Sequence, residues 1–298
     1  MMDRGFLLVD KPAGMTSHDV VARVRRIIGI RKVGHAGTLD PAATGLLVCG
    51  VGPATKLMRF VQDLPKEYVG QIRFGVATDS LDADGEETYR RPMTVTRDDL
   101  EGLVERFTGT IQQVPPMVSA LKVGGKRLHE LAREGIEIER ESRPVEIHSL
   151  QILDVRPGEY SEAVIRVVCA KGTYIRVLAD DLAKALGGRA HLTALRRLKT
   201  GQLSVDRAVT LEKLEALGEA GTWDSVMLAP FEALAALPSC LVRSEVADRV
   251  RNGARLSPAD VPGEWSQGAY VRIADTGENL LAVHRMTAGT FVPEVVLP

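Results

Sequence analysis

The order of apolar patterns along the chain is the feature that most limits its fold. Stretches with helical spacing begin after Thr16, Thr96 and Thr210. Stretches with the two-residue period of strands lie between them, most clearly over 145–153 and 163–169. These stretches do not follow the regular strand–helix–strand repeat that builds a doubly wound parallel sheet. We therefore expect an α+β fold with a mixed, mainly antiparallel sheet.

Capping signals mark the two ends of the first helix. Thr16 is followed three residues later by Asp19, which is the spacing of a capping box. Gly29 can adopt the left-handed conformation that often ends a helix. The other expected elements are strands over 6–9 and 68–75, helices over 54–61 and 178–186, and a loop over 78–87.

The character of the sequence changes near residue 235. Beyond the helix that begins at Thr210, which we expect to be the last, short strand-like runs lie at 270–273, 280–284 and 291–296, separated by Gly and Pro. A segment of this length and pattern suits a small β-barrel. We therefore expect one domain over 1–235 and a second over 236–298.

Composition argues against several classes of protein. Of the 298 residues, 45% are hydrophobic and 26% are charged, as in ordinary globular proteins. No run of about 18 uninterrupted apolar residues occurs, so we expect no membrane span, and the early charges do not resemble a signal peptide. Cys49, Cys169 and Cys240 lie far apart in apolar surroundings, which indicates reduced thiols in a cytoplasmic protein.

Common cofactor and metal motifs are incomplete in this sequence. The stretch 50–56 lacks the second half of a phosphate-binding glycine motif. The stretch 80–85 resembles the start of a calcium loop, but Ser80 replaces the first Asp and Arg91 stands at position twelve. HExxH and GxSxG patterns do not occur. We therefore expect no metal and no cofactor.

One loop presents a single carboxylate. Asp40 is the one acidic residue in 34–45, where it precedes Pro41 and lies between Gly37 and Gly45. A residue before proline is restricted to extended conformations, and glycines permit tight turns and close approach of a ligand. Asp40 is therefore the candidate for acid–base or nucleophilic chemistry.

Six segments in the first 200 residues resemble, in the same order, those of the TruB family of tRNA pseudouridine synthases. They are residues 8–17, 34–45, 66–68, 113–122, 171–176 and 190–197. The resemblance implies a pseudouridine-synthase catalytic domain followed by a PUA-like RNA-binding domain. It also implies isomerisation of uridine 55 in the T loop of tRNA, in which the glycosidic bond breaks and re-forms at C5 without a cofactor.

The resemblance assigns roles to residues that match the family's motifs. Asp40 would act at the sugar, either as a nucleophile at C1′ or as a base that removes the 2′ proton. Arg176, expected at the end of the strand over 163–169, would keep Asp40 ionised. Tyr68 would stack on the flipped uracil with its hydroxyl near C5, and Tyr174 and Leu195 would line the same pocket.

Other matched positions suggest contacts with RNA. His35 would fill the space left by the flipped base or stack inside the RNA loop. Lys11 and Lys56 would support the catalytic loop or touch phosphate. The charged segment 117–143 corresponds to a mobile element that closes over the RNA. Clusters of Lys and Arg within 23–32 and 189–199 could follow phosphates or form solvated helix faces.

The expected partner is the T-arm stem-loop of tRNA, recognised by shape because aromatic residues make up only 4% of the chain. Guide-RNA-dependent relatives typically have a longer chain with a basic tail, so we expect no guide RNA, and we expect a monomer. Three alternatives stay open: a guide-dependent enzyme, a non-catalytic RNA-binding or folding protein, and a uridine hydrolase. A hydrolase usually needs two partnered carboxylates, and this loop has one.

Overall fold

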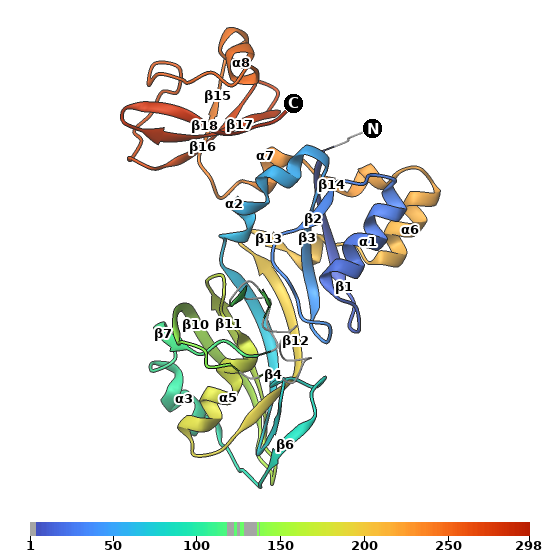
Figure 1. Ribbon diagram of the computed structural model, residues 1–298, viewed down its shortest axis with the longest axis vertical. Helices are drawn as coiled ribbons and strands as arrows, with labels where there is room; N and C mark the ends of the chain where they lie inside the picture. The colour runs from blue at the N-terminus through green and yellow to red at the C-terminus, as the bar shows by residue number, and fades with distance from the viewer. Residues whose placement is uncertain (1–3, 118–121, 124–125, 128–135, 137) are drawn as a thin grey trace. The chain divides into compact units, whose positions relative to one another are not determined.

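The computed structural model describes residues 4–117, 122–123, 126–127, 136 and 138–298 (Figure 1). The chain folds into two units. Unit 1 consists of Met1–Asp40, Gly45–Asp63 and Thr200–Pro298, and unit 2 of Pro41–Thr44 and Leu64–Lys199. The division into domains over 1–235 and 236–298 remains a prediction.

The main sheet of unit 1 contains the strand that leads into the Asp40 loop. Its strands follow the order β14 (Met227–Leu228), β1 (Gly5–Lys11) and β3 (Thr44–Val51), and β2 (Val33–His35) also pairs with β3. All of these pairs are antiparallel. Helices α1 (Ser17–Ile28) and α6 (Leu211–Glu219) pack against this sheet, because their apolar sides join one buried cluster with β1 and β3.

The predicted ends of the first helix are confirmed. Thr16 caps α1 by accepting a hydrogen bond from the Asp19 amide, and the Asp19 carboxylate binds the Thr16 amide in return. Gly29 ends the helix in the left-handed conformation with φ of 71°. Thr96 and Asp99 form the same reciprocal cap at α3 (Arg97–Val104).

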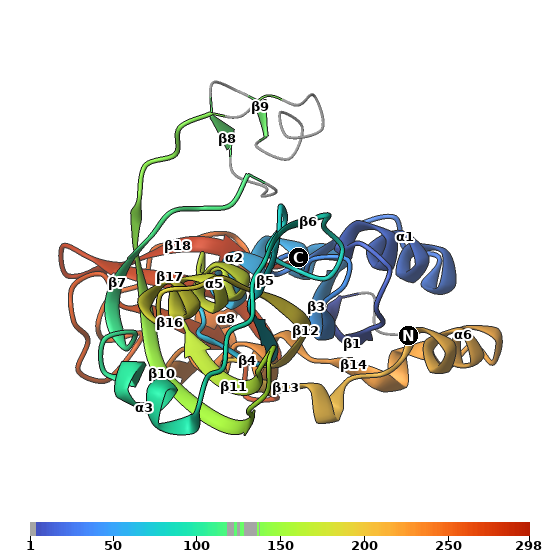
Figure 2. The same cartoon turned by 90° about the horizontal axis from the view of Figure 1, so that it is seen from below.

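In unit 2, helices cover one face of an antiparallel run of strands. The order is β12 (Ala190–Thr200), β4 (Lys66–Phe74), β11 (Glu162–Cys169), β10 (Arg143–Arg156) and β7 (Gly109–Gln113). The pairs β4–β11, β11–β10 and β10–β7 are antiparallel. Strand β11 buries every second residue, and α3 and α5 (Ile175–Ala185) pack on that side (Figure 2). The α+β prediction is therefore confirmed.

Short elements complete unit 2. A hairpin of β5 (Val76–Thr78) and β6 (Glu87–Arg90) encloses the loop expected over 78–87. A second small pair joins β8 (Lys122–Val123) and β9 (Lys126–Arg127). This pair belongs to the predicted RNA-closing segment 117–143. Most of that segment lies outside the described residues, which omit 118–121, 124–125, 128–135 and 137.

A second sheet in unit 1 contains the three strands predicted near the end of the chain. Its order is β15 (Ser239–Leu241), β16 (Tyr270–Ala274), β17 (Leu280–Thr287) and β18 (Thr290–Val296). Among the described residues no pair between β15 and β18 closes this sheet. The predicted barrel is therefore not confirmed: the structure has an open sheet with helix α8 (Ser244–Arg251) packed on β17 and β18.

Three local predictions need correction. The helix expected over 54–61 is split into a 3₁₀ helix, η1 (Gly52–Leu57), and α2 (Met58–Gln62). Arg176 does not lie at a strand end: the chain turns at Gly172, where φ is 85°, and Arg176 is the second residue of α5. The helix after Thr210 is not the last, since α7 (Pro230–Ala233) and α8 follow.

The other short elements are β13 (Leu203–Ser204), η2 (Val205–Arg207) and η3 (Trp223–Val226). No described helix combines the length and the apolar character needed to cross a membrane.

Candidate active site

The loop that ends at Asp40 is fixed to the N-terminus of α1. The buried Ser17 hydroxyl donates to the Leu39 carbonyl at 3.1 Å and accepts from the Leu39 amide at 2.9 Å. At the start of the loop, the Ala36 amide donates to the Val48 carbonyl at 2.8 Å. One side chain therefore holds the backbone of the residue directly before Asp40, which restricts where the carboxylate can point.

Lys11 lies at the base of the same loop. It is the last residue of β1, opposite Gly45 on β3, and its side chain is completely buried. Its ammonium group donates to the Pro12 carbonyl at 2.9 Å. Of the two roles predicted for Lys11, this burial favours support of the loop over contact with phosphate.

His35 and Lys56 also belong to unit 1. His35 ends β2 and is half-buried, and its ring meets that of His18 edge-on with centroids 5.3 Å apart. Lys56 is exposed on η1. An exposed lysine is accessible to a phosphate, so the structure leaves that predicted role for Lys56 open.

Tyr68 and Leu195 pack against one cluster in unit 2. Tyr68 lies on β4 and Leu195 on β12, and both contact the core that contains α5. Gly70 is two residues from Tyr68 and therefore faces the same side of the strand. A Cβ at Gly70 would lie 3.1 Å from Leu192 and 3.6 Å from Leu195. The missing side chain lets β12 side chains lie close to the strand that carries Tyr68.

Tyr174 is held by a residue to which the sequence analysis assigned no role. The buried Gln113 side chain accepts from the Tyr174 amide at 2.8 Å and donates to the Tyr174 carbonyl at 3.1 Å. The Arg176 guanidinium lies 6.0 Å from the centre of the Tyr174 ring. Gln113 therefore positions the turn that carries both predicted site residues.

Arg176 is a buried cation with a carboxylate partner. The residue is 3% exposed, and its Nη1 donates to the Ser80 carbonyl and to Asp82 Oδ2, each at 3.1 Å. The Ser80 hydroxyl and the Asp84 amide hold the other Asp82 oxygen. Asp82 lies in the loop that resembles a calcium site. The repeated Asp spacing of this loop is typical of a tight, hydrogen-bonded turn. That spacing is the sequence signal from which Asp82 could have been identified.

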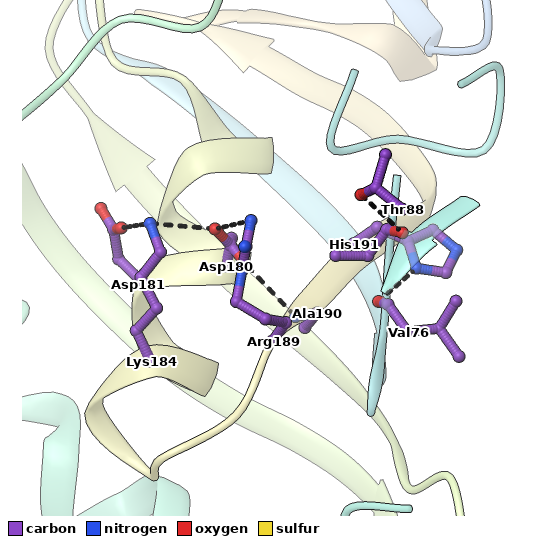
Figure 3. A network of polar contacts seen from close by, with 9 residues as sticks. Val76, Thr88, Asp180, Asp181, Lys184, Arg189, Ala190 and His191 are labelled. Carbon is purple, nitrogen blue, oxygen red and sulfur yellow. Dashed lines mark hydrogen bonds and ion pairs between the residues drawn. The ribbon is translucent and has the colours of Figure 1, made fainter. Parts of the chain in front are cut away.

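A second network joins α5 to the turn before β12 (Figure 3). Asp180 is completely buried and accepts from Arg189 at 2.7 and 3.1 Å, from Lys184 at 2.9 Å and from the Ala190 amide at 3.3 Å. The hydrogen bonds that Arg189 donates to Asp180 raise the pKa of Arg189, whereas burial raises the pKa of Asp181. This network fixes the helix that carries Arg176 relative to the strand that carries Leu195.

Cys169 stands at the end of β11, opposite Lys66. Burial raises the pKa of its thiol to about 11, so the thiol remains protonated near neutral pH. A protonated thiol is a poor nucleophile, which leaves Asp40 as the stronger candidate. Among the described residues, no group of three or more His, Cys, Asp or Glu side chains is arranged to hold a metal ion.

The predicted site residues are thus distributed over both units. Unit 2 brings Tyr174 beside Arg176 and packs Tyr68 and Leu195 into one cluster. Unit 1 holds Lys11, His35, Asp40 and Lys56, and it fixes the Asp40 loop through Ser17.

Comparison with known proteins identifies the family. Residues 25–175 match the N-terminal domain model of TruB family pseudouridylate synthase, and residues 176–235 match the tRNA pseudouridylate synthase B C-terminal domain. The tRNA pseudouridine synthase B of Symbiobacterium thermophilum is 50% identical over 250 residues, which cover 84% of this chain and 82% of the relative. The protein of the same name from Geobacillus kaustophilus is 44% identical over 257 residues, covering 85% and 90%.

A solved structure shares the fold along almost the whole chain. A chain in the crystal structure of a Cbf5-Nop10-Gar1 complex matches with a TM-score of 0.77 at 25% identity, covering 98% of this chain and 84% of that one. The family resemblance in the six sequence segments is therefore confirmed, and the chain belongs to the TruB family of pseudouridine synthases.

Proposed function

We propose that this chain converts uridine 55 in the T loop of tRNA to pseudouridine. The observation that carries the proposal is the Asp40 loop, which presents one carboxylate next to a backbone position that Ser17 holds. Relatives 50% and 44% identical to this chain bear the name tRNA pseudouridine synthase B. These names support the same reaction for this chain.

The reaction rearranges bonds within one nucleotide. The bond between C1′ and N1 breaks, the uracil turns within the pocket, C5 bonds to C1′, and the C5 proton leaves while N1 gains one. Substrate and product are isomers, so the reaction needs no external water or oxidant. Asp40 acts at the sugar, either by attacking C1′ or by removing the 2′ proton, and both routes require an ionised carboxylate.

Arg176 keeps that carboxylate ionised in the substrate complex. A nearby cation favours the charged form of a carboxyl group, which burial beneath a bound base would otherwise disfavour. A guanidinium carries five N–H donors in a planar fork, so Arg176 can serve both Asp82 and Asp40. Asp82 in turn orients the Arg176 guanidinium, so Asp82 is a positioning residue.

The base-binding surface is formed by Tyr68, Tyr174 and Leu195. Flipping a base out of its stack costs a few kcal/mol, part of which stacking on an aromatic ring restores. Tyr68 provides that ring and places its hydroxyl near C5, where a proton must leave. His35 fills the gap in the RNA loop, and the segment 117–143 closes over the bound RNA.

The partner is the T-arm of tRNA, bound without a guide RNA, and residues 236–298 form a second RNA-binding domain. A bare T-arm transcript containing uridine 55 tests this directly. We expect the purified protein to form pseudouridine at that position, detected by mass spectrometry of the digested RNA. A transcript with cytidine 55 is the matched control.

Other outcomes would select an alternative function. Activity only after addition of a guide RNA would favour the guide-dependent alternative. Free uracil released in proportion to turnover would indicate a hydrolase. RNA binding without any modified uridine would indicate a non-catalytic RNA-binding protein.

A further inference from the structure

We infer that a basic pocket in unit 1 binds a backbone phosphate of the substrate RNA, an inference that rests on the proposed function. The pocket has a volume of about 350 Å³ and is lined by Lys32, Pro53, Lys56, Arg251 and residues 296–298. None of the site residues proposed above except Lys56 takes part in it. The phosphate that it binds lies away from the flipped base.

Local backbone structure brings the two lysines to one wall of the pocket. The Gly52 amide donates to the Lys32 carbonyl at 2.8 Å, which joins the residue before β2 to the first turn of η1. In a 3₁₀ helix, side chains three residues apart lie on the same side. Pro53 and Lys56 have this spacing, so Lys56 points to the side on which Lys32 is held.

The other lining residues, Arg251 and 296–298, come from the C-terminal part of the chain. Arg251 is the last residue of α8, and Asp248 at 2.9 Å and Asp275 at 3.7 Å hold its guanidinium. The strand β18 is tied to α2 by an ion pair between Arg59 and Glu294 at 2.6 Å. A contact between the rings of Phe60 and Tyr270, with centroids 5.2 Å apart, adds an apolar link.

The charge of the pocket selects an anion. Three basic side chains line it, and within the described part of the chain no Asp or Glu side chain does. Pro298, whose main-chain oxygen accepts a hydrogen bond from Arg4, also lines it. Asp248 and Asp275 offset part of the Arg251 charge, but Lys32 and Lys56 add two further positive charges. Lysine and arginine contacts to phosphates dominate the affinity of proteins for nucleic acids, and they make binding salt-dependent.

The position of the pocket points to RNA rather than to a free anion. Lys32 directly precedes β2 and lies three residues before His35, a distance of about 10 Å in an extended chain. His35 opens the loop that leads to Asp40. A phosphate in the pocket would therefore lie within a few nucleotides of the modified uridine, and Arg251 would give the C-terminal sheet a direct share in binding.

Lys32→Ala and Arg251→Ala test the inference, with Lys213→Ala on α6 as the matched control. We expect each pocket variant to bind the T-arm transcript about threefold to tenfold more weakly, and the control to match the wild type. Plots of log affinity against log salt should lose about one unit of slope. The loss should appear in the half-saturating RNA concentration rather than in the rate at saturation.

The double variant and a stability measurement separate this role from a structural one. If Lys32 and Arg251 contact one phosphate, the fold-loss in RNA affinity of the double variant should be smaller than the product of the fold-losses of the two single variants. Pocket variants that match Lys213→Ala in affinity and salt slope would overturn the inference. A lower melting temperature with unchanged affinity would show that the pocket only holds the C-terminal sheet. Failure of the wild type to form pseudouridine would contradict the proposed function instead.

Discussion

At the scale of single residues, the candidate site depends on buried polar groups that are held by polar partners from other segments. Arg176 is the clearest case, because a buried guanidinium is stable only when its charge is compensated. Asp82 provides that match from a loop 94 residues away in the sequence. The position of Arg176 therefore depends on a contact between two segments that no local sequence pattern pairs.

Asp82→Asn tests this dependence. The substitution keeps the shape of the side chain but removes the charge that compensates Arg176. We expect the free energy of unfolding to fall by about 1–3 kcal/mol and the single-turnover rate of isomerisation to fall with it. Urea unfolding and rapid-quench kinetics measure the two effects. The exposed neighbour Asp84→Asn is the control, and equal behaviour of both variants would contradict a positioning role for Asp82.

The identity of Asp40 as the candidate catalytic residue could be predicted from sequence, whereas its supports could not. A lone acid between a glycine turn and a proline is visible within twelve residues of sequence. Ser17, Asp82 and Gln113 act through contacts with segments far away along the chain. Sequence patterns describe local conformation, and these contacts exist only after the segments have packed.

At the scale of elements, prediction succeeded where the signal is local. Both capping boxes lie within four residues, and both helices begin where they predict. Strand β12 was not predicted, because charged residues interrupt its apolar pattern; one of them, Arg197, is only 1% exposed in the fold. Strand β3 is an almost continuous apolar run, a pattern that does not distinguish a buried strand from a buried helix.

Gln113→Leu tests the link between β7 and α5. The variant leaves the amide and carbonyl of Tyr174 without their side-chain partner, so we expect the protein to lose about 1–3 kcal/mol of stability. Because Arg176 lies in the same turn of helix, the isomerisation rate should fall as well. Thermal unfolding and single-turnover assays measure these changes. Gln112→Leu, at an exposed position next to it, should leave both nearly unchanged.

Ser17→Ala tests the anchor of the catalytic loop. Loss of the two hydrogen bonds with Leu39 should cost about 1–2 kcal/mol and leave the residue before Asp40 less restrained. We therefore expect a slower single-turnover rate with little change in the affinity for RNA. Ser225→Ala, at an exposed serine, is the comparison. A Ser17 variant with the wild-type rate would show that the loop is held by other contacts.

At the scale of the whole molecule, the sequence indicated where the C-terminal strands lie but not how they are arranged. The three predicted strands are present, yet the parallel pairing of β15 with β16 and the helix α8 were not foreseen. Strand order depends on which strand edges are left to pair after the core has formed. Helix α8 was not foreseen because it is only eight residues long. The C-terminal sheet also contains a buried histidine with a consequence for stability.

His284 should make the protein less stable in mild acid. Burial lowers the pKa of this histidine below its usual value of 6.5, while Nε2 stays 3.1 Å from the Ala254 carbonyl. Below about pH 6.5 the unfolded chain therefore binds a proton that the native histidine does not, and stability decreases as the pH falls. We expect His284→Gln to flatten the melting temperature between about pH 5 and 7. The same dependence of melting temperature on pH in the wild type and in His284→Gln would contradict this. His148→Gln, at an exposed histidine, is the control.

Tritium release tests most directly whether Asp40 carries out the isomerisation. Wild type and Asp40→Asn are compared on a T-arm transcript labelled with [5-³H]uridine, with RNA affinity measured in parallel. We predict that only the wild type releases tritium, while Asp40→Asn still binds the RNA. Release by Asp40→Asn at the wild-type rate would contradict the assignment of Asp40, and no release by either protein would contradict the proposed reaction on this substrate.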